Sequence, residues 1–117
     1  MSGQRSYHAG RVAEDQVAAR YAHLGADVCA RRWRGRSGEI DLIARDGAQV
    51  IFIEVKQSRS HARAAESLSA RQMARICASA SEFLGGEPAG QNTECRFDLA
   101  LVDAMGRIEI MENAFAA

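Results

Sequence analysis

The sequence predicts one α/β domain over residues 1–117, in which a sheet is flanked by two main helices. Two segments carry apolar residues at the three- and four-residue spacing of amphipathic helices, and five segments are predicted as strands, the clearest by alternation of apolar and polar residues. The elements follow in the order helix, three strands, helix, strand, strand, which is typical of an α/β sandwich of modest size. The length suits one ordinary domain with one hydrophobic core.

Charge is distributed unevenly, although the formal net charge is zero. Residues 1–75 contain thirteen Arg and Lys against eight Asp and Glu, whereas residues 76–117 contain two against seven. The chain is therefore not globally basic, but its N-terminal part can form a local face that binds phosphates.

The three cysteines, Cys29, Cys77 and Cys95, form no C-x-x-C pair and lie in apolar segments. We expect buried free thiols in a reducing compartment, and the His and Cys residues give no case for zinc. No apolar run is long enough to span a membrane, and the N-terminus has no secretory signal pattern. We therefore expect a cytoplasmic protein that does not associate with membranes.

The first helix is predicted over residues 6–24. Its apolar stripe has helical spacing and consists of Ala9, Ala13, Val17, Tyr21 and Leu24, with a stop at Gly25. Glu14 lies beside this stripe. Its carboxylate either reaches over the sheet edge to a site on the sheet or is an ordinary solvated helix carboxylate.

A first strand over residues 27–33, at the edge of the sheet, runs into an arginine-rich segment. Four arginines surround one tryptophan in the order Arg31, Arg32, Trp33, Arg34 and Arg36. Such a segment can hold phosphates and stack on a base or sugar, which makes Arg31, Arg34 and Arg36 candidate nucleic-acid contacts. Equally, Trp33 can pack in the core while the arginines face water.

The most informative segment is a predicted hairpin with strands over 38–43 and 51–56. An Asp-Gly pair lies between them, and Gly tolerates the positive φ of a tight turn. Side chains alternate between the faces of a strand, so Glu54 and Lys56 share one face. With an even-numbered turn, such as 46–49, Asp41 lies directly opposite Glu54, whereas an odd loop with a bulge separates them.

Carboxylates that oppose each other in a sheet destabilise the strand pair, and a divalent cation removes the conflict. Mg²⁺ and Mn²⁺ take hard oxygen ligands, so Asp41 and Glu54 are candidate metal ligands and Glu14 is a candidate third. Lys56, the only lysine in the chain, would orient an attacking water or stabilise charge at phosphorus. The alternative is a solvated hairpin face on which Glu54 and Lys56 form a surface ion pair.

The second helix is predicted over residues 69–84, with an S-x-x-Q capping box at its start. Arg71 and Gln72 lie in its first turn, where a helix favours anions, so they are candidate phosphate contacts unless they are simply surface residues. Residues 57–63 before it are predicted as a polar, basic loop in which Arg59 is a further candidate.

Two last strands are predicted over residues 94–103 and 107–111. Arg96 and Asp98 in the first of them are expected to form a structural pair on one face rather than a second metal site.

Several motifs resemble those of the YraN family, small bacterial proteins predicted to be endonucleases. They are GEIDLI at 38–43, FIEVK at 52–56, ARRWR at 30–34 and RFD at 96–98, so the resemblance extends over nearly the whole chain. The family belongs to the PD-(D/E)XK nuclease superfamily, with relatives among Holliday junction resolvases and restriction enzymes. This chain departs from it at Ala13, where the family has Gly, and at Ile40, where the superfamily name has Pro.

The resemblance implies a restriction-endonuclease-like fold with an αβββαβ core and a mixed sheet. It also implies that Asp41, Glu54 and Lys56 are the catalytic residues of a Mg²⁺- or Mn²⁺-dependent endonuclease, with Glu14 near the metal. The expected partner is nucleic acid, with DNA, including branched DNA, favoured over RNA. A homodimer is a candidate assembly for cutting a branched substrate. Two alternatives stay open: a non-catalytic nucleic-acid-binding module in DNA repair, recombination or uptake, and a structural interaction protein.

Overall fold

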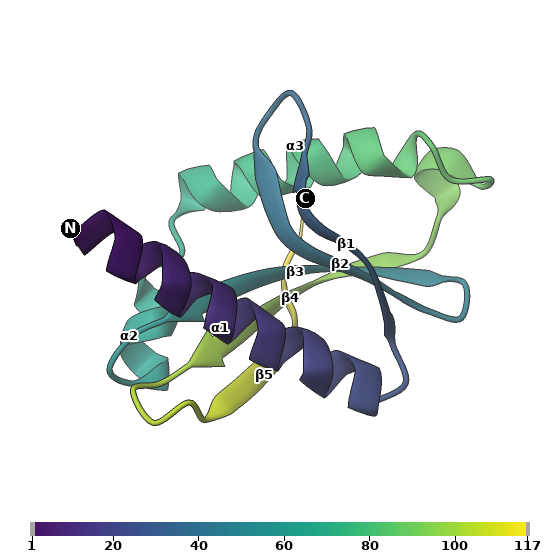
Figure 1. Cartoon of the computed structure of the whole chain (residues 1–117). Coiled ribbons are helices and arrows are strands. Elements are labelled where there is room, and N and C mark those ends of the chain that lie inside the picture. Colours follow the sequence, from purple (N-terminus) through teal and green to yellow (C-terminus); the bar gives the residue numbers. More distant parts are fainter. Residues whose placement is uncertain (1, 117) are drawn as a thin grey trace.

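The computed structural model describes residues 2–116, with side chains from Gly10 to Ala116. Within these residues the chain forms one mixed sheet with helices on both faces (Figure 1). The elements are α1 (Ser2–His23), β1 (Asp27–Arg34), β2 (Glu39–Asp46), β3 (Gln49–Gln57), α2 (His61–Glu66), α3 (Ala70–Leu84), η1 (Gly90–Asn92), β4 (Cys95–Val102) and β5 (Ile108–Phe115).

The strands lie in the sheet in their chain order, and only β3 and β4 are parallel among the neighbouring pairs. The long connection through α2 and α3 is what allows β4 to run parallel to β3, because parallel neighbours need a crossover. The predicted α/β class and αβββαβ order are confirmed, with β5 as an added edge strand. The arrangement is compatible with a restriction-endonuclease-like fold.

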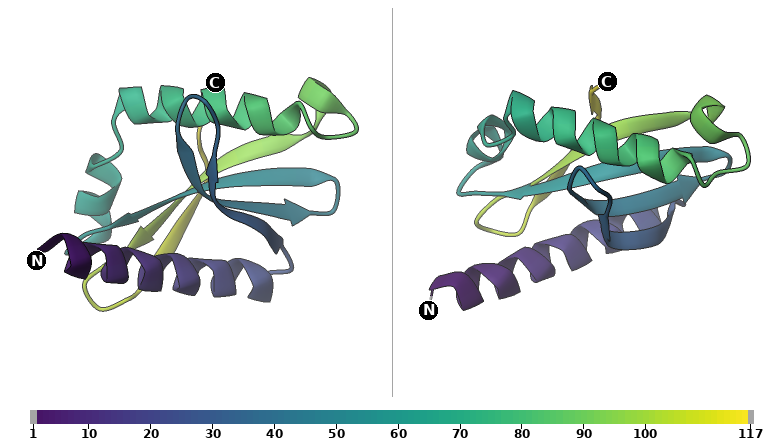
Figure 2. Two further views of the ribbon diagram at one scale, coloured as in Figure 1. Left: turned by 45° about the horizontal axis from the view of Figure 1, so that its top comes forward. Right: turned by 90° about the horizontal axis from the view of Figure 1, so that it is seen from above.

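The core consists of two main layers, one on each face of the sheet (Figure 2). On one face α1 packs Ala13, Val17, Ala18 and Tyr21 against Leu42, Ala44, Ile51 and Ile53. On the other face α3 packs Ile76, Ala80 and Leu84 against Ile40, Ile43, Phe52 and Phe97. The helical spacing of the apolar residues in α1 and α3 places each stripe on the sheet, because residues three and four apart share a helix face.

The β2–β3 hairpin has the register that the even-numbered turn predicts. Its pairs run from Leu42↔Ile53 to Asp46↔Gln49, and the turn itself is Gly47-Ala48, with Gly47 at a φ of 61°. The alternation predicted for β2 is broken, however, because Ile40 packs in the α3 layer together with Ile43, whereas Leu42 packs in the α1 layer. The break falls at Asp41, just beyond the last hairpin pair.

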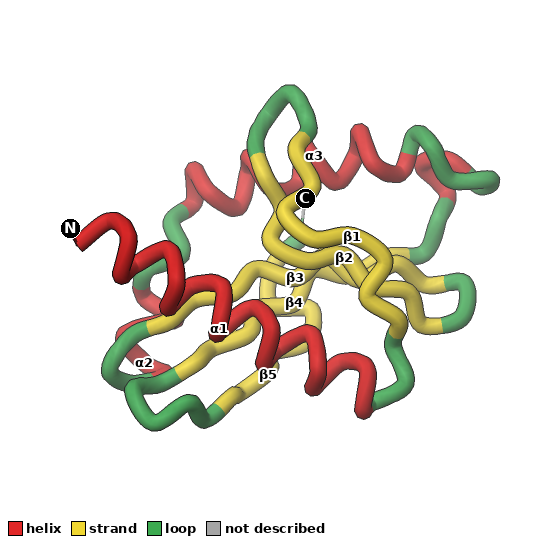
Figure 3. Tube along the Cα trace, viewed as in Figure 1, coloured by secondary structure: helices red, strands yellow, loops and turns green. Residues whose placement is uncertain are grey.

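The connection between β1 and β2 extends to α3, as Figure 3 shows. The carboxylate of Glu82 accepts hydrogen bonds from the backbone N–H groups of Arg36, at 2.9 and 3.0 Å, and of Ser37, at 3.3 Å. The hydroxyl of Ser79 donates to the carbonyl of Gly38 at 2.9 Å. These bonds fix the start of β2 against α3.

Three predicted boundaries need correction, and the first is the last strand, β5, which runs to Phe115 rather than to residue 111. α1 begins at Ser2 rather than at residue 6, and Leu24 is 62% exposed instead of belonging to the apolar stripe. The predicted loop over 57–63 contains the start of a short helix, α2, whose N-cap Ser60 accepts from the N–H of Arg63. The side chain of Ala9, predicted in the stripe, lies outside those described.

The cysteines are free, but the prediction that all three are buried is wrong. Cys29 is exposed at the irregularity of the β1–β2 ladder between Val28 and Ala30, and Cys77 and Cys95 are half-buried. Trp33 packs in the α3 layer with its ring 5.5 Å from that of Phe83, so the core interpretation of this tryptophan is confirmed. Over residues 2–116, no helix combines the length and the apolar character that a membrane span requires.

Candidate active site

Asp41 and Glu54 lie together on adjacent strands beside a cavity of about 200 Å³. The cavity is lined by Gly38, Glu39, Asp41, Glu54, Gln72, Arg75 and Ile76. Its walls therefore come from the start of β2, the middle of β3 and the first turns of α3. The two carboxyl groups share this cavity as the hairpin register predicts.

Where the β2–β3 ladder ends, the side chain of Asp41 takes the place of a backbone carbonyl as hydrogen-bond acceptor. Its Oδ2 accepts a hydrogen bond from the N–H of Val55 at 2.8 Å. Burial raises the pKa of Asp41, and this bond together with the charge of Lys56 offsets only part of the rise. The carboxyl group is thus held in place with less stabilisation of its negative charge than water would give it.

Glu54 has the least satisfied carboxyl group of the pair. Its Oε2 lies 3.5 Å from the Nζ of Lys56, and its buried Oε1 has no hydrogen-bond partner among the described residues. Burial, and next the charge of Asp41, raise the pKa of Glu54 to about 8. A buried oxygen without a partner is costly, so this site would be stabilised by a proton or a cation.

The chemistry of the pair fits a hard divalent cation. The two carboxyl groups, one of which has an oxygen without a partner among the described residues, offer the hard oxygen donors that Mg²⁺ and Mn²⁺ select. Among the described side chains, no group of three or more His, Cys, Asp or Glu is arranged to hold a metal ion. A cation at Asp41 and Glu54 would therefore take its remaining ligands from water, backbone or substrate.

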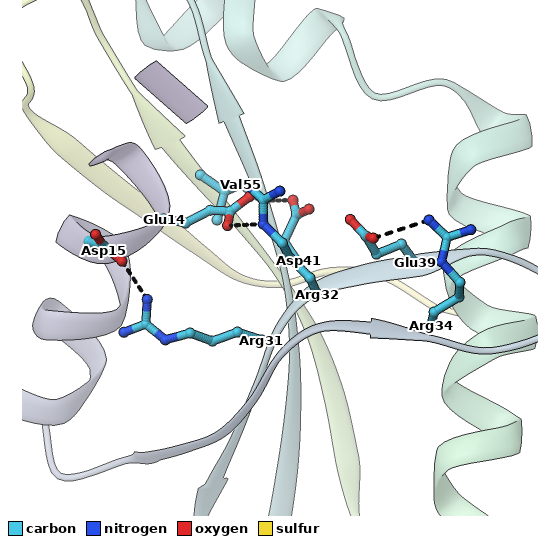
Figure 4. Close-up of polar contacts among 8 residues, drawn as sticks. All are labelled: Glu14, Asp15, Arg31, Arg32, Arg34, Glu39, Asp41 and Val55. Atoms are coloured by element: carbon cyan, nitrogen blue, oxygen red, sulfur yellow. Dashed lines mark hydrogen bonds and ion pairs between the residues drawn. The ribbon is translucent and has the colours of Figure 1, made fainter. Parts of the chain in front are cut away.

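Glu14, the predicted third ligand, is partly buried and forms an ion pair with Arg32, as Figure 4 shows. The Nε of Arg32 lies 3.1 Å from its Oε1, and the two side chains are 32% and 14% exposed. Burial and then the charge of Asp41 raise the pKa of Glu14, so the two carboxyl groups act on each other. The solvated interpretation of Glu14 is thereby wrong, and its role as a ligand stays a prediction.

Arg32 reaches Glu14 from an unusual backbone conformation. Its φ is 49°, in the left-handed region that few residues other than Gly, Asn and Asp adopt. The residue lies between the pairs Arg31↔Leu42 and Trp33↔Ile40, so its place in the ladder is opposite Asp41.

The other arginines of β1 also contact carboxylates. Arg31 pairs with Asp15 at 2.5 Å and Arg34 with Glu39 at 3.5 Å, and both arginine side chains are at least half exposed. The predicted nucleic-acid contacts thus divide into two groups. Arg31 and Arg34 are ion-paired, whereas Arg36, Arg59 and Arg71 are exposed and do not line the cavity.

Gln72 is the one predicted nucleic-acid contact that lines the cavity. Its Oε1 accepts from the N–H of Ser69 at 3.0 Å while its own N–H is bonded to the Ser69 hydroxyl, which confirms the capping box. Arg75, one turn further along α3, and Glu39 were missed. Their spacing could have predicted this position. Arg75 follows Gln72 by three residues on a helix, and Glu39 precedes Asp41 by two on a strand, so each shares a face with a predicted site residue.

A second buried carboxylate, Asp98 on β4, lies apart from this site. Arg96 donates to it at 3.0 Å, so the predicted structural pair is confirmed. Tyr21 and the backbone of Asn113 donate as well, at 2.7 and 2.9 Å. His61 does not line the cavity either. Its ring nitrogens contact the carbonyl of Arg107 and the carboxylate of Glu109.

Comparison with known proteins identifies the family. The model described as Uncharacterised protein family UPF0102 matches residues 13–102. A UPF0102 protein of Cereibacter sphaeroides strain KD131 is 69% identical over 117 residues, with 100% of both chains covered. UPF0102 proteins of Ruegeria pomeroyi and Roseobacter denitrificans are 61% and 48% identical, covering 97% and 98% of this chain and 92% and 89% of theirs. The chain therefore belongs to the UPF0102 family, which confirms the resemblance to YraN proteins.

Proposed function

We propose that this protein is a nuclease that hydrolyses nucleic-acid phosphodiester bonds with Mg²⁺ or Mn²⁺. The observation that carries the proposal is the pair of carboxyl groups at Asp41 and Glu54, which share a cavity, lack enough compensating donors and have Lys56 beside them. Perturbed carboxyl groups in a cavity are typical of catalytic sites. Together with the order of the elements, they favour the nuclease that the motifs predict.

Each residue would have a distinct role. Asp41 and Glu54 would hold the metal ion, which would supply Lewis-acid stabilisation of the charge developing at phosphorus. The ammonium of Lys56, 3.5 Å from Glu54, would hold the attacking water or steady the same charge. Glu14 would add a ligand, directly or through water, once Arg32 releases it.

A non-catalytic nucleic-acid-binding module is the second candidate. It is favoured by the Glu14–Arg32 ion pair, which occupies the predicted third ligand, and by the lack of a three-ligand group among the described side chains. Such a protein would keep the fold and bind nucleic acid without efficient cleavage.

We expect DNA rather than RNA as the substrate, and endonucleolytic cleavage that includes branched DNA. A homodimer would suit a branched substrate, because two strands must then be cut.

Cleavage assays separate the two candidates. Branched DNA, linear DNA and RNA are incubated with the protein and with Mn²⁺, Mg²⁺ or EDTA. The nuclease proposal predicts metal-dependent cleavage that Asp41→Asn and Lys56→Ala abolish. Binding without cleavage under every metal favours the module, and cleavage that survives both substitutions contradicts the assigned site.

A further inference from the structure

Arg75 differs in its surroundings from the other arginines whose side chains the structure describes. Six of the described arginines form no ion pair with a described carboxylate, namely Arg20, Arg36, Arg59, Arg63, Arg71 and Arg75. Of these six, only Arg75 lines the cavity that contains Asp41 and Glu54. An exposed guanidinium without a partner, at the mouth of an acidic cavity, can bind an anion that enters it.

The backbone that carries Arg75 is held in a fixed position over this cavity. A Cβ added to Gly38, whose φ of 147° requires glycine, would lie 4.0 Å from the Cβ of Arg75. Four residues along α3, Ser79 donates to the Gly38 carbonyl, and the capping box fixes the helix start. The turn of α3 that carries Arg75 is therefore anchored at Ser79 and at the helix start, while Arg75 itself is exposed.

The cavity has walls of opposite character. The carboxyl groups of Asp41 and Glu54 lie on the sheet, and the cation that acts on both of them is Lys56. Arg75 stands on the helix wall with Gln72, and its guanidinium makes no ion pair with either carboxylate. The space between these walls suits a phosphodiester, which presents oxygens both to a cation held by the carboxylates and to an arginine.

We propose that Arg75 binds a backbone phosphate of the nucleic acid and so positions the strand over Asp41 and Glu54. This inference rests on the proposed function for its ligand, but it assigns a substrate-binding residue that the motifs do not predict. The planar guanidinium would hold two non-bridging oxygens at once, which an ammonium cannot do.

The test measures binding of a short fluorescein-labelled DNA duplex in EDTA, where no metal-dependent cleavage occurs. Arg75→Ala is compared with wild type and with Arg20→Ala, which removes one exposed arginine from the last turn of α1. We expect Arg75→Ala to bind about tenfold more weakly and to lower the slope of log Kd against log salt by about 0.9, the loss of one phosphate contact. Arg20→Ala should stay within about twofold of wild type.

Arg75→Lys sharpens the result, because it keeps the charge but not the fork of donors. It should restore most of the salt dependence and only part of the affinity. If Arg75→Ala does not fold, as judged by circular dichroism, Arg75→Gln takes its place.

Binding by Arg75→Ala that equals binding by Arg20→Ala overturns the inference, and so does a wild-type protein that binds no DNA. Cleavage by wild type in Mn²⁺ is measured in parallel. Binding that depends on Arg75, without any cleavage, supports this inference and rejects the nuclease proposal. Cleavage together with Arg75-independent binding does the reverse.

Discussion

Two acidic centres lie within the same sheet, and they differ in how their charges are compensated. Asp98 on β4 is fully buried, and its oxygens accept from the Tyr21 hydroxyl, the Arg96 guanidinium and the Asn113 backbone. Glu54 on β3 keeps 12% of its side chain exposed, yet its buried Oε1 has no partner among the described residues. The more deeply buried carboxylate thus has the larger number of donors.

The difference separates a structural carboxylate from a site that would take a ligand. Asp98 is a buried charge that the chain itself surrounds with hydrogen-bond donors. These donors come from α1, β4 and β5, so the carboxylate links the three elements. Two partly buried carboxyl groups with Lys56 next to one of them, as at Asp41 and Glu54, leave negative charge that an added proton or metal ion would stabilise. The comparison predicts different responses to substitution at the two centres: a loss of stability at Asp98 and a changed pH dependence of stability at Glu54.

The largest effect is expected at Asp98. Asp98→Ala removes the acceptor of the buried Tyr21 hydroxyl and of the Arg96 Nε, in a side chain that is 21% exposed, and we expect a loss of about 3–5 kcal/mol in the free energy of unfolding. Urea denaturation in EDTA measures it. The matched control is Asp15→Ala, an exposed aspartate whose loss should cost less than about 1 kcal/mol. Equal costs for both variants would remove the distinction between the centres.

A smaller loss is expected from the hydroxyl that joins α1 to Asp98. Tyr21→Phe keeps the ring, which is 2% exposed, and removes only the donor at 2.7 Å. Hydrogen bonds to charged acceptors contribute about 1.5–3 kcal/mol, so urea denaturation should show a loss of that size. An unchanged unfolding midpoint would mean that Arg96 and Asn113 suffice for Asp98.

At the other centre, substitution should change the pH dependence of stability. The pKa of Glu54 is about 8 in the folded chain against 4.5 as its ordinary value, so the folded state holds a proton that the unfolded state releases in this window. Without metal, stability should fall as pH rises from about 5 to 8, with a slope of up to about 1.4 kcal/mol per pH unit.

Glu54→Gln should remove most of this slope, and unfolding midpoints measured in EDTA across the window test it. Glu66→Gln, at an exposed position on α2, should keep the wild-type slope. A wild-type protein whose stability rises over the same window would contradict the raised pKa of Glu54.

The smallest effect concerns the cation beside Glu14. Arg32→Asn removes the guanidinium, while asparagine tolerates the φ of 49° at this position. Losing one nearby positive charge should strengthen Mn²⁺ binding about fivefold, or about 1 kcal/mol, as measured by isothermal titration calorimetry. Arg34→Asn, which removes a side chain that is 77% exposed, should change it by less than about twofold. Weaker Mn²⁺ binding in Arg32→Asn would show that Arg32 does not compete with the metal.

The sequence predicts the scaffold of the site because the scaffold depends on local patterns. Alternation and the Asp-Gly pair predict the hairpin but leave its register open between an even-numbered turn and an odd loop with a bulge, whereas Ser69 with Gln72 predicts the start of α3. The Glu14–Arg32 pair depends instead on a left-handed residue and on how α1 crosses β1, which local patterns do not encode. The exposure of Cys29 follows from an irregularity in the β1–β2 ladder, and α2 was missed because a six-residue helix has no apolar period to detect.

The position of Arg75 could be predicted only in part from the sequence. Its spacing from Gln72 was visible in the sequence, but the contact of α3 with Gly38 that brings it to the cavity is tertiary. The sequence predicts a site at Asp41 and Glu54 because like charges across a hairpin repel each other. That the Oε1 of Glu54 has no hydrogen-bond partner among the described residues is visible only in the fold.

Electron paramagnetic resonance titration with Mn²⁺ is the most direct test of the claim that Asp41 and Glu54 form a cation site. The free Mn²⁺ signal is followed as wild type, Asp41→Asn and the control Asp15→Asn are added. We predict saturable binding by wild type and by Asp15→Asn, and its loss in Asp41→Asn. An Asp41→Asn variant that binds Mn²⁺ as wild type does, or a wild-type protein without saturable binding, would contradict the account.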